Sequence, residues 1–319
     1  MPRPLRPLPA IHLDTDIGGD IDDLCALALV LAWPGAELAA VTTVSDDGGR
    51  RAGYARHALE LAGRADVPVA AGADVSLGCY SPVPGFPGRE RAYWPDPVPP
   101  APGAHDAALD LLERSIARGA VVAAVGPYTN LALLEQRSPG VLRDARLCLM
   151  GGHALPSREG FPRWDYREDW NIQVDYESAR RVFESSSPTL VPLSATGETW
   201  LGRAHLPALA RSASKLARLI ARQAEAFAED EKEKALYGRE CAGLPDDFIN
   251  FQHDPLACAV ALGWDEGVEL REVPLKYEVV GGALRQRVEE GGRMTRVLSK
   301  VDGGRFSQFW LDLVAGAGR

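Results

Sequence analysis

The feature that most limits the possible folds is a regular alternation of two patterns through the first two thirds of the chain. Short, nearly continuous apolar runs predict strands that are buried on both faces of a sheet. These runs are residues 11–13, 37–44, 67–71, 120–125, 146–150 and 189–193. Helical patterns separate them at residues 22–33, 51–63, 105–118, 129–136 and 176–184. Repeated strand–helix–strand units predict an α/β fold: an open, mostly parallel sheet with helices on both faces.

The last third of the chain adds elements of a different kind. Residues 214–237 carry a long helical pattern, and we interpret its charge run at 229–234 as a solvated helix face. Two paired strands and a closing helix are predicted at residues 268–280, 286–297 and 306–314. Because neither an internal repeat nor a linker interrupts the sequence, we expect a single domain over residues 1–319.

One proline-rich stretch, residues 76–103, interrupts the alternation. It is too long for an ordinary connector, which makes it a functional loop or a possible lid. It contains several aromatic side chains and an arginine that would suit stacking on a planar ligand: Tyr80, Phe86, Arg89, Tyr93 and Trp94. A surface loop or an oligomer contact is the competing interpretation.

The net charge and the apolar segments limit the kinds of binding partner and the location that this chain is expected to have. Lys and Arg number 35 and Asp and Glu 44, for a net charge of −9, which argues against nucleic acid and against an anionic membrane surface. The longest apolar stretch, 24–33, is about half of a bilayer span. The first residues resemble no signal peptide, and the scattered cysteines fit neither a disulfide framework nor a zinc site. We therefore expect a cytoplasmic protein.

An acidic cluster follows the first predicted strand. Five aspartates fall within ten residues: Asp14, Asp16, Asp20, Asp22 and Asp23. Open α/β sheets bind ligands at the carboxyl edge of their strands, where this turn lies. Crowded carboxylates repel one another unless a cation neutralises them. Oxygen donors without soft ligands favour Ca²⁺ or Mg²⁺ over zinc.

Three competing interpretations fit the acidic cluster less well. Helix capping accounts for at most Asp22 and Asp23, and not for the aspartates before them. An EF-hand loop beginning at Asp14 would need an acid where Cys25 stands. A phosphotransferase of the haloacid-dehalogenase type also begins with Asp-x-Asp, but its motif needs Thr or Val where this chain has Gly18. That reaction is kept as an alternative.

The order of several motifs resembles a known family. Residues 13–27 are similar to the N-terminal signature of the inosine-uridine-type nucleoside hydrolases, in the variant form Asp-Thr-Asp-x-Gly-x-Asp-x-Asp-Asp. Further segments resemble that family in the same order: 39–44, 67–74, 124–131, 149–152, 169–175, 253–255 and 309–310. The resemblance covers nearly the whole chain. It implies a Rossmann-like fold and a calcium-dependent hydrolase that cleaves a ribonucleoside into ribose and free base.

The resemblance also implies a metal site. Asp16, Asp23 and Asp254 would ligate Ca²⁺ together with the backbone carbonyl of Val125. Asp16 would in addition be the base that takes a proton from the attacking water. Because the family's common form has fewer residues before its Asp-Asp pair, Asp20 is an open alternative to Asp22 or Asp23.

The same resemblance implies how the sugar would be held. Asp22 and Asn171 would bind the 2′- and 3′-hydroxyls, and Asp169 stands where a family Glu meets the 5′-hydroxyl. Met150 would line the sugar pocket. His253, if protonated, would assist departure of the base. Asp14 is expected to be a hydrogen-bond acceptor behind the site.

Two segments depart from the family pattern, and both border the expected base side. The proline-rich stretch replaces a motif rich in His and Gly, and residues 156–166 are longer than their counterpart. The leaving group is therefore left open, and a catalytically weak binding protein on the same fold is a second alternative. Family resemblance further implies a homodimer or homotetramer and a role in purine or pyrimidine salvage.

Overall fold

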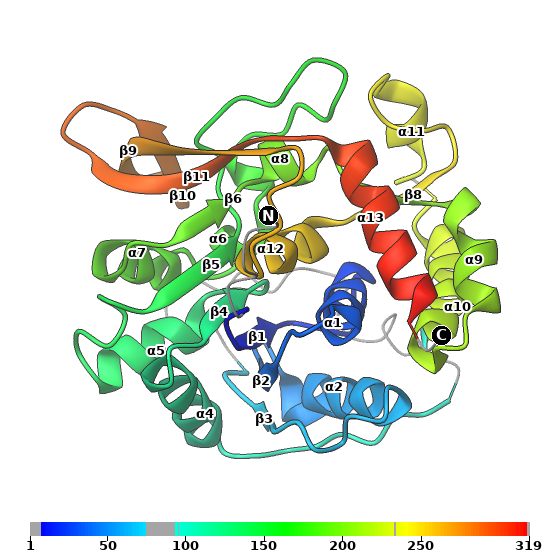
Figure 1. The fold of residues 1–319 in the computed structure, drawn as a ribbon. Helices are drawn as coiled ribbons and strands as arrows, with labels where there is room; N and C mark the ends of the chain where they lie inside the picture. The colour runs from blue at the N-terminus through cyan, green and yellow to red at the C-terminus, as the bar shows by residue number, and fades with distance from the viewer. Residues whose placement is uncertain (1–7, 75–92, 95, 233, 318–319) are drawn as a thin grey trace, which may run out of the picture.

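The structure is a computed structural model that describes residues 8–74, 93–94, 96–232 and 234–317. Its main sheet has nine strands in the order β10-β9-β11-β6-β5-β4-β1-β2-β3 (Figure 1). The strands of this sheet are β1 (Ile11–Thr15), β2 (Leu38–Thr43), β3 (Val69–Ala71), β4 (Val121–Ala124), β5 (Arg146–Met150), β6 (Thr189–Val191), β9 (Val268–Val280), β10 (Ala283–Val288) and β11 (Arg293–Val301). All pairings are parallel except those of β9 with β10 and β11. The predicted α/β fold with a mostly parallel sheet is confirmed.

Helices cover both faces of this sheet, and a small antiparallel pair, β7 (Trp200–Gly202) with β8 (Phe248–Phe251), stands apart from it. Figure 1 shows α1, α12 and α13 on one side and α4, α5 and α7 on the other. The α-helices are α1 (Asp22–Ala32), α2 (Arg50–Leu61), α4 (His105–Ala117), α5 (Thr129–Arg137), α6 (Trp170–Gln173), α7 (Tyr176–Ser185), α8 (Leu193–Thr196), α9 (Leu206–Arg211), α10 (Lys215–Asp230), α11 (Leu236–Glu240), α12 (His253–Ala261) and α13 (Gly303–Gly316). Short 3₁₀ helices are η1 (Asp47–Gly49), η2 (Tyr166–Glu168) and η3 (Arg203–His205). In the described part of the chain, no helix combines the length and apolar character that crossing a bilayer requires.

The near-continuous apolar strands are explained by two hydrophobic clusters, one on each face. Along β4, Val121 and Ala123 join the cluster of α1, α12 and α13, whereas Val122 and Ala124 join the cluster of α4, α5 and α7. Successive strand residues point to opposite faces. Because both faces are buried, both sets of residues must be apolar.

The C-terminal strands differ from the sequence prediction. We predicted two strands, 268–280 and 286–297, but the structure has three, because a turn ends β10 at Val288. In this turn the N–H of Gly292 donates to the carbonyl of Glu289 at 3.0 Å, and Gly291 has a φ of 77°. A positive φ suits glycine and ends regular pairing, so the predicted second strand spanned two real ones.

The strand order creates the position of the site. The chain builds β1, β2 and β3 in one direction and then crosses to the other side of β1 to build β4, β5 and β6. The connections therefore leave β1 and β4 on opposite sides, and the loops after these two strands open a crevice. The aspartate-rich turn follows β1 and lies in this crevice.

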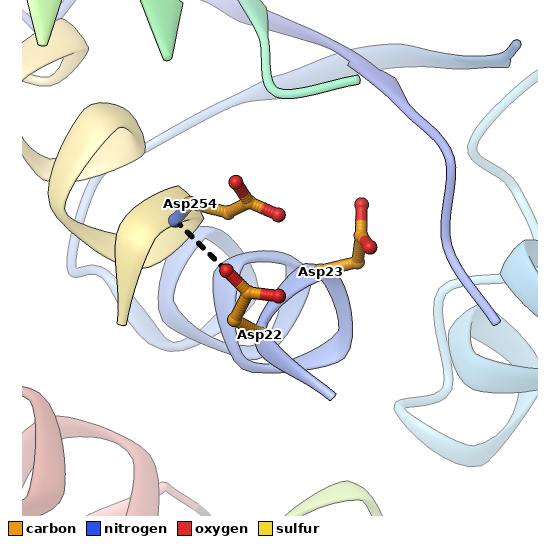
Figure 2. A group of neighbouring side chains, drawn as sticks. All are labelled: Asp22, Asp23 and Asp254. Carbon is orange, nitrogen blue, oxygen red and sulfur yellow. Dashed lines mark hydrogen bonds between the residues drawn. The ribbon is translucent and has the colours of Figure 1, made fainter. Parts of the chain in front are cut away.

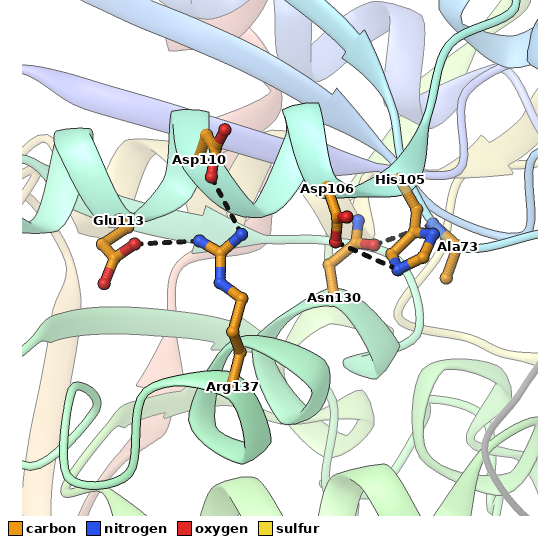
Figure 3. A network of polar contacts seen from close by, with 7 residues as sticks. All are labelled: Ala73, His105, Asp106, Asp110, Glu113, Asn130 and Arg137. Atoms are coloured by element: carbon orange, nitrogen blue, oxygen red, sulfur yellow. Dashed lines mark hydrogen bonds and ion pairs between the residues drawn. The ribbon is translucent and has the colours of Figure 1, made fainter.

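Asn130 ties together the strand ends that support the crevice. Its Nδ2 donates to Asp14 Oδ1 at 2.8 Å and to the carbonyl of Thr43 at 2.9 Å. Its Oδ1 accepts the N–H of Ala73 at 2.9 Å (Figure 3). One buried amide thus joins β1, β2 and the segment after β3. Asp14 is the buried acceptor that the sequence analysis expected.

Candidate active site

A cavity of about 260 Å³ opens at the carboxyl edge of the sheet. Its lining contains every residue to which the sequence analysis assigned a catalytic, sugar-binding or metal-binding role: Asp16, Asp22, Asp23, Val125, Met150, Asp169, Asn171, His253 and Asp254. Among the described residues, the lining also contains Asp20, Glu168, Trp170 and Leu193. The predicted residues are therefore brought together, while their individual roles stay predictions.

Three carboxylates converge where two helices begin. Asp22 and Asp23 lie in the first turn of α1 and Asp254 in the first turn of α12, with one oxygen of each within 4.8 Å of the others (Figure 2). The backbone N–H of Asp254 also donates to Asp22 Oδ2 at 3.4 Å. Burial, reinforced by the neighbouring carboxylates, raises the pKa of all three well above the usual range. Oxygen donors crowded in this way suit a hard divalent cation.

Asp16 approaches the cluster from the loop after β1. The indole N–H of Trp170 donates to its Oδ2 at 3.2 Å. On the other side, a Cβ added at Gly126 would lie 2.8 Å from Asp16 Oδ1, so only glycine permits this approach. The guanidinium of Arg51 donates to the backbone carbonyls of Asp16 and Ile17. Burial raises the pKa of the Asp16 carboxyl, and the charge of Arg51 opposes that rise.

The converging group differs from the predicted ligand set in one member. Asp23 and Asp254 belong to both, but the third carboxylate of the group is Asp22, to which we had assigned a sugar hydroxyl. Asp16, which we had assigned to the metal, lies in the same cavity. The predicted carbonyl ligand, that of Val125, accepts a hydrogen bond from Asn171 Nδ2 at 2.8 Å.

The sugar-side residues are held by backbone groups. Asn171 Nδ2 also lies 3.1 Å from the carbonyl of Met150. Asp169 accepts the N–H of Gly152 and, at 3.1 Å, the N–H of Ile172, so it caps α6. Burial raises the pKa of Asp169 to about 6. Because the short Asp side chain is anchored to these two amides, it is rigidly placed at the cavity wall.

Asp20 differs from the other aspartates of the cluster in having a lysine partner. Its carboxylate accepts from Lys234 Nζ at 2.6 Å and from Asn250 Nδ2. Lys234 also lies 3.1 Å from Asn250 Oδ1. We had interpreted the charge run 229–234 as a solvated face, and for Lys234 this was wrong, because its ammonium group turns inward to the carboxylate of Asp20.

His253 lies on the expected base side, between aromatic rings. Its Nδ1 is 2.6 Å from the hydroxyl of Thr196. The ring centroids of Trp164 and Phe251 lie 5.8 and 5.2 Å from that of His253. Burial lowers the pKa of His253 to about 3, which leaves the ring neutral at neutral pH. A protonated His253, as the sequence analysis considered, is therefore disfavoured in this environment.

The structure describes one of the two segments that depart from the family pattern in full and the other only in part. Within 156–166, Trp164 packs on His253 and donates to the hydroxyl of Tyr237 at 3.1 Å. Of the stretch 76–103, residues 76–92 and 95, with Tyr80, Phe86 and Arg89, lie outside the described residues. Trp94 is buried against Tyr54 of α2, with ring centroids 4.4 Å apart, and does not line the cavity.

Comparison with known proteins assigns the family. The family model described as inosine-uridine preferring nucleoside hydrolase matches residues 11–308. The chain belongs to this family. The haloacid-dehalogenase alternative is thereby set aside.

Nucleoside hydrolases are also found among relatives of known name. A pyrimidine-specific ribonucleoside hydrolase RihA from an Enterobacter species is 34% identical over 190 residues, which cover 57% of this chain and 58% of that protein. An uncharacterized protein of Schizosaccharomyces pombe is 32% identical over 196 residues, covering 58% and 61%. These alignments thus span about three fifths of the relatives' own length.

Solved structures of the family share the fold. The plant nucleoside hydrolase PpNRh1 superposes with a TM-score of 0.79 at 22% identity, covering 97% of this chain and 99% of that one. A purine-preferring ribonucleoside hydrolase from Gardnerella vaginalis has a TM-score of 0.74 at 21% identity, covering 96% and 98%. At such identities the likeness concerns the fold alone.

Sequence reasoning missed three polar partners of the site. Trp170 entered the sequence analysis only as part of the segment 169–175, and Lys234 only as part of the charge run. Thr196 belonged to no recognised pattern. Each contacts a predicted residue that is distant in sequence. A pattern of neighbouring residues contains no information about such pairs.

Proposed function

We propose that this chain is a calcium-dependent ribonucleoside hydrolase that cleaves the N-glycosidic bond to yield ribose and a free base. The observation that carries the proposal is the convergence of Asp22, Asp23 and Asp254 beside Asp16 in one crevice. Family membership supports the same reaction. The relatives' names differ in the base they specify, so the proposal extends to the ribosyl group and not to one nucleobase.

The residues present fit a hard cation, because all their donors are oxygens. Asp16, Asp23 and Asp254 with the carbonyl of Val125 are the proposed ligands, and Asp22 adjoins them. When bound, a calcium ion would polarise a water molecule and fix the orientation of the sugar diol.

The chain's own side chains would supply the rest of the chemistry. Asp16 would take the proton of the attacking water, with its other oxygen held by the N–H of Trp170. Asp22 and Asn171 would hold the ribose hydroxyls, which places C1′ for attack. Among the described residues that line the cavity there are acids but no lysine or arginine. Such a lining favours the positive charge that develops on the ribose ring as the bond breaks.

The wider setting follows the same proposal. We infer a small-molecule nucleoside as substrate, a cytoplasmic location, a homodimer or homotetramer, and a role in purine or pyrimidine salvage. The stretch 76–103 as a lid is part of the proposal, although Trp94 itself packs in the core.

Two kinetic comparisons test the proposal. Asp16→Asn should lower kcat by about 10³-fold or more while KM changes little, because the base acts in the transition state. A 2′-deoxynucleoside should be hydrolysed far more slowly than its ribo partner, since groups built for a hydroxyl are left unpaired. Asp110→Asn, an exposed acid on α4, is the control and should behave like the wild type. Binding of ribosides without any hydrolysis would instead support the weak binding protein.

A further inference from the structure

A second cavity, of about 300 Å³, opens at the amino edge of the main sheet, opposite the edge that forms the active site. It lies where β4, β5 and β6 begin, and the first residue of each strand lines it: Val121, Arg146 and Thr189. The last turn of α12 forms another part of its wall. Asp254 of the active site lies at the other end of this helix, so the two cavities share α12 but no lining residue.

Two arginines reach this cavity from the strands on either side of β6. Thr189 of β6 is in register with Cys148 of β5 and with Arg296 of β11. Arg146 lies two positions before Cys148 and therefore points to the same face of the sheet. Because β5 and β11 are the outer members of three adjacent strands, they lie about 10 Å apart. Arg146 and Arg296 thus flank the Thr189 side chain from opposite sides, and all three line the cavity.

The charges of these two arginines are not neutralised by carboxylates. In the described part of the chain, neither Arg146 nor Arg296 forms an ion pair or a side-chain hydrogen bond. Glu272 of β9 stands opposite Arg296 in the strand register, yet no ion pair joins them, and Glu272 does not line the cavity. The described lining contains no Asp or Glu, although acids outnumber Lys and Arg by 44 to 35 in the whole chain. Two positive charges therefore face one cavity without a counter-charge.

The other polar groups around the cavity also suit an anion. Ser187 and Thr189 bring hydroxyls to the lining, and a hydroxyl can donate to an anionic oxygen. Free carbonyls at the end of α12 would repel an anion. Three of these carbonyls are occupied, because the N–H groups of Leu262, Gly263 and Trp264 donate to them at 2.9–3.0 Å. The repulsion from the helix end is thereby weakened.

We propose that this cavity is a second ligand site, which binds the phosphate group of a small molecule between Arg146 and Arg296. The planar guanidinium fork matches phosphate oxygens and forms two parallel hydrogen bonds with them. A cavity of about 300 Å³ accommodates inorganic phosphate or a small phosphate monoester, and the net charge of −9 disfavours a long polyanion such as nucleic acid. Because the site lies outside the active-site cavity, the inference does not depend on the proposed reaction.

Isothermal titration calorimetry with inorganic phosphate, on metal-free protein at constant ionic strength, tests the site. Arg146→Gln and Arg296→Gln should each weaken phosphate binding by about tenfold or more, because each removes charge-assisted hydrogen bonds. Arg271→Gln is the matched control: it also removes one positive charge from this sheet, but from an arginine already paired with Glu269 at 2.8 Å. Its Kd should equal that of the wild type. A wild type that binds no phosphate, or equal Kd values in the wild type and both cavity variants, would overturn the proposal.

Two further titrations identify the source of the phosphate group and its place. Ribose 5-phosphate that binds at least tenfold more tightly than inorganic phosphate assigns the site to a phosphate monoester, and any smaller difference assigns it to the free ion. Asp23→Asn changes the active-site cavity and should leave both Kd values as in the wild type. If Asp23→Asn alters phosphate binding and the arginine variants do not, phosphate binds in the active-site cavity and the proposal is overturned. If the wild type hydrolyses no riboside, the proposed function fails, and these titrations still decide the second site.

Discussion

Replacing Asp23 by Asn should stabilise the metal-free protein and abolish most of its response to calcium. Asn has the same shape and keeps an oxygen that can accept from Thr15, which donates to Asp23 in the wild type. What changes is the negative charge next to Asp22 and Asp254. Relative to the wild type, the substitution should therefore stabilise the protein without calcium and destabilise it when calcium is bound.

The distance between the carboxylates sets the magnitude. Unit charges 4.8 Å apart repel by about 3 kcal/mol at an effective dielectric constant of ~20. The raised pKa values mean that partial protonation already relieves some of this repulsion. Near pH 8 we therefore expect Asp23→Asn to gain about 1–2 kcal/mol without metal, which corresponds to roughly 2–6 °C in Tm.

Calcium reverses the order of stability. At 100 times its Kd, a ligand of the folded state adds about 2.7 kcal/mol to the free energy of unfolding. If Asp23→Asn weakens binding by about 100-fold, the same calcium concentration adds only about 0.4 kcal/mol. The wild type should then be the more stable of the two proteins.

Thermal unfolding of chelator-treated protein, with and without added calcium, measures both effects. Asp110→Asn is the matched control: it also removes one negative charge, but from the exposed pair that Asp110 of α4 forms with Arg137 of α5 (Figure 3). Surface pairs of this kind contribute little, so both of its Tm values should follow the wild type. An undiminished calcium shift in Asp23→Asn, or a lower metal-free Tm, would refute the reasoning.

Three further substitutions test other parts of the structure. Trp170→Phe keeps the ring but loses the hydrogen bond to Asp16, so steady-state kinetics should give a kcat about fivefold lower with KM nearly unchanged; an unchanged kcat would contradict this. Asn130→Ala removes three buried hydrogen bonds and should lower the free energy of unfolding, measured in urea, by about 3 kcal/mol. A loss below about 1 kcal/mol would argue against a structural role of Asn130. Burial raises the pKa of Glu198 from 4.5 to about 7 against the opposing charge of Arg158, so the folded state holds the proton of Glu198 more tightly than the unfolded chain does. The free energy of unfolding should therefore fall by about 1–2 kcal/mol between pH 4.5 and 7, after allowance for solvent screening. Glu198→Gln should remove that fall and be more stable than the wild type at pH 8. If the free energy of unfolding of the two proteins changes in parallel with pH, this role of Glu198 is excluded.

Much of the fold was predictable because its determinants are local in sequence. The strand from Arg146 to Met150 was predicted with its observed limits, since a short apolar run between turn residues has few other uses in an α/β chain. The site residues were predictable for a related reason. Parallel strands that end at one edge bring their following residues together, so Asp16 after β1 and Val125 after β4 had to be neighbours.

The parts that could not be predicted depend on contacts between distant residues. Lys234 and Asp20 are 214 positions apart, and Thr196 and His253 are 57 apart. The charge run 229–234 has the composition of a solvated helix face, and only the end of α10 at Asp230 turns Lys234 inward. The burial of Trp94 against Tyr54 could not be predicted either, because an aromatic residue in a proline-rich stretch suits a lid as well as a hydrophobic core.

The ion pair of Asp20 also explains how the variant signature preserves the site. The helix α1 begins at Asp22, so the packing of α1 against α12 determines where Asp22 and Asp23 meet Asp254. The residues before Asp22 form a turn outside the helix and can vary in number without moving that junction. Asp20 belongs to this turn, and its charge is compensated by Lys234. The extra acid of the variant signature therefore binds the segment between α10 and α11 to the rim of the cavity, while the converging carboxylates stay on the two helix ends.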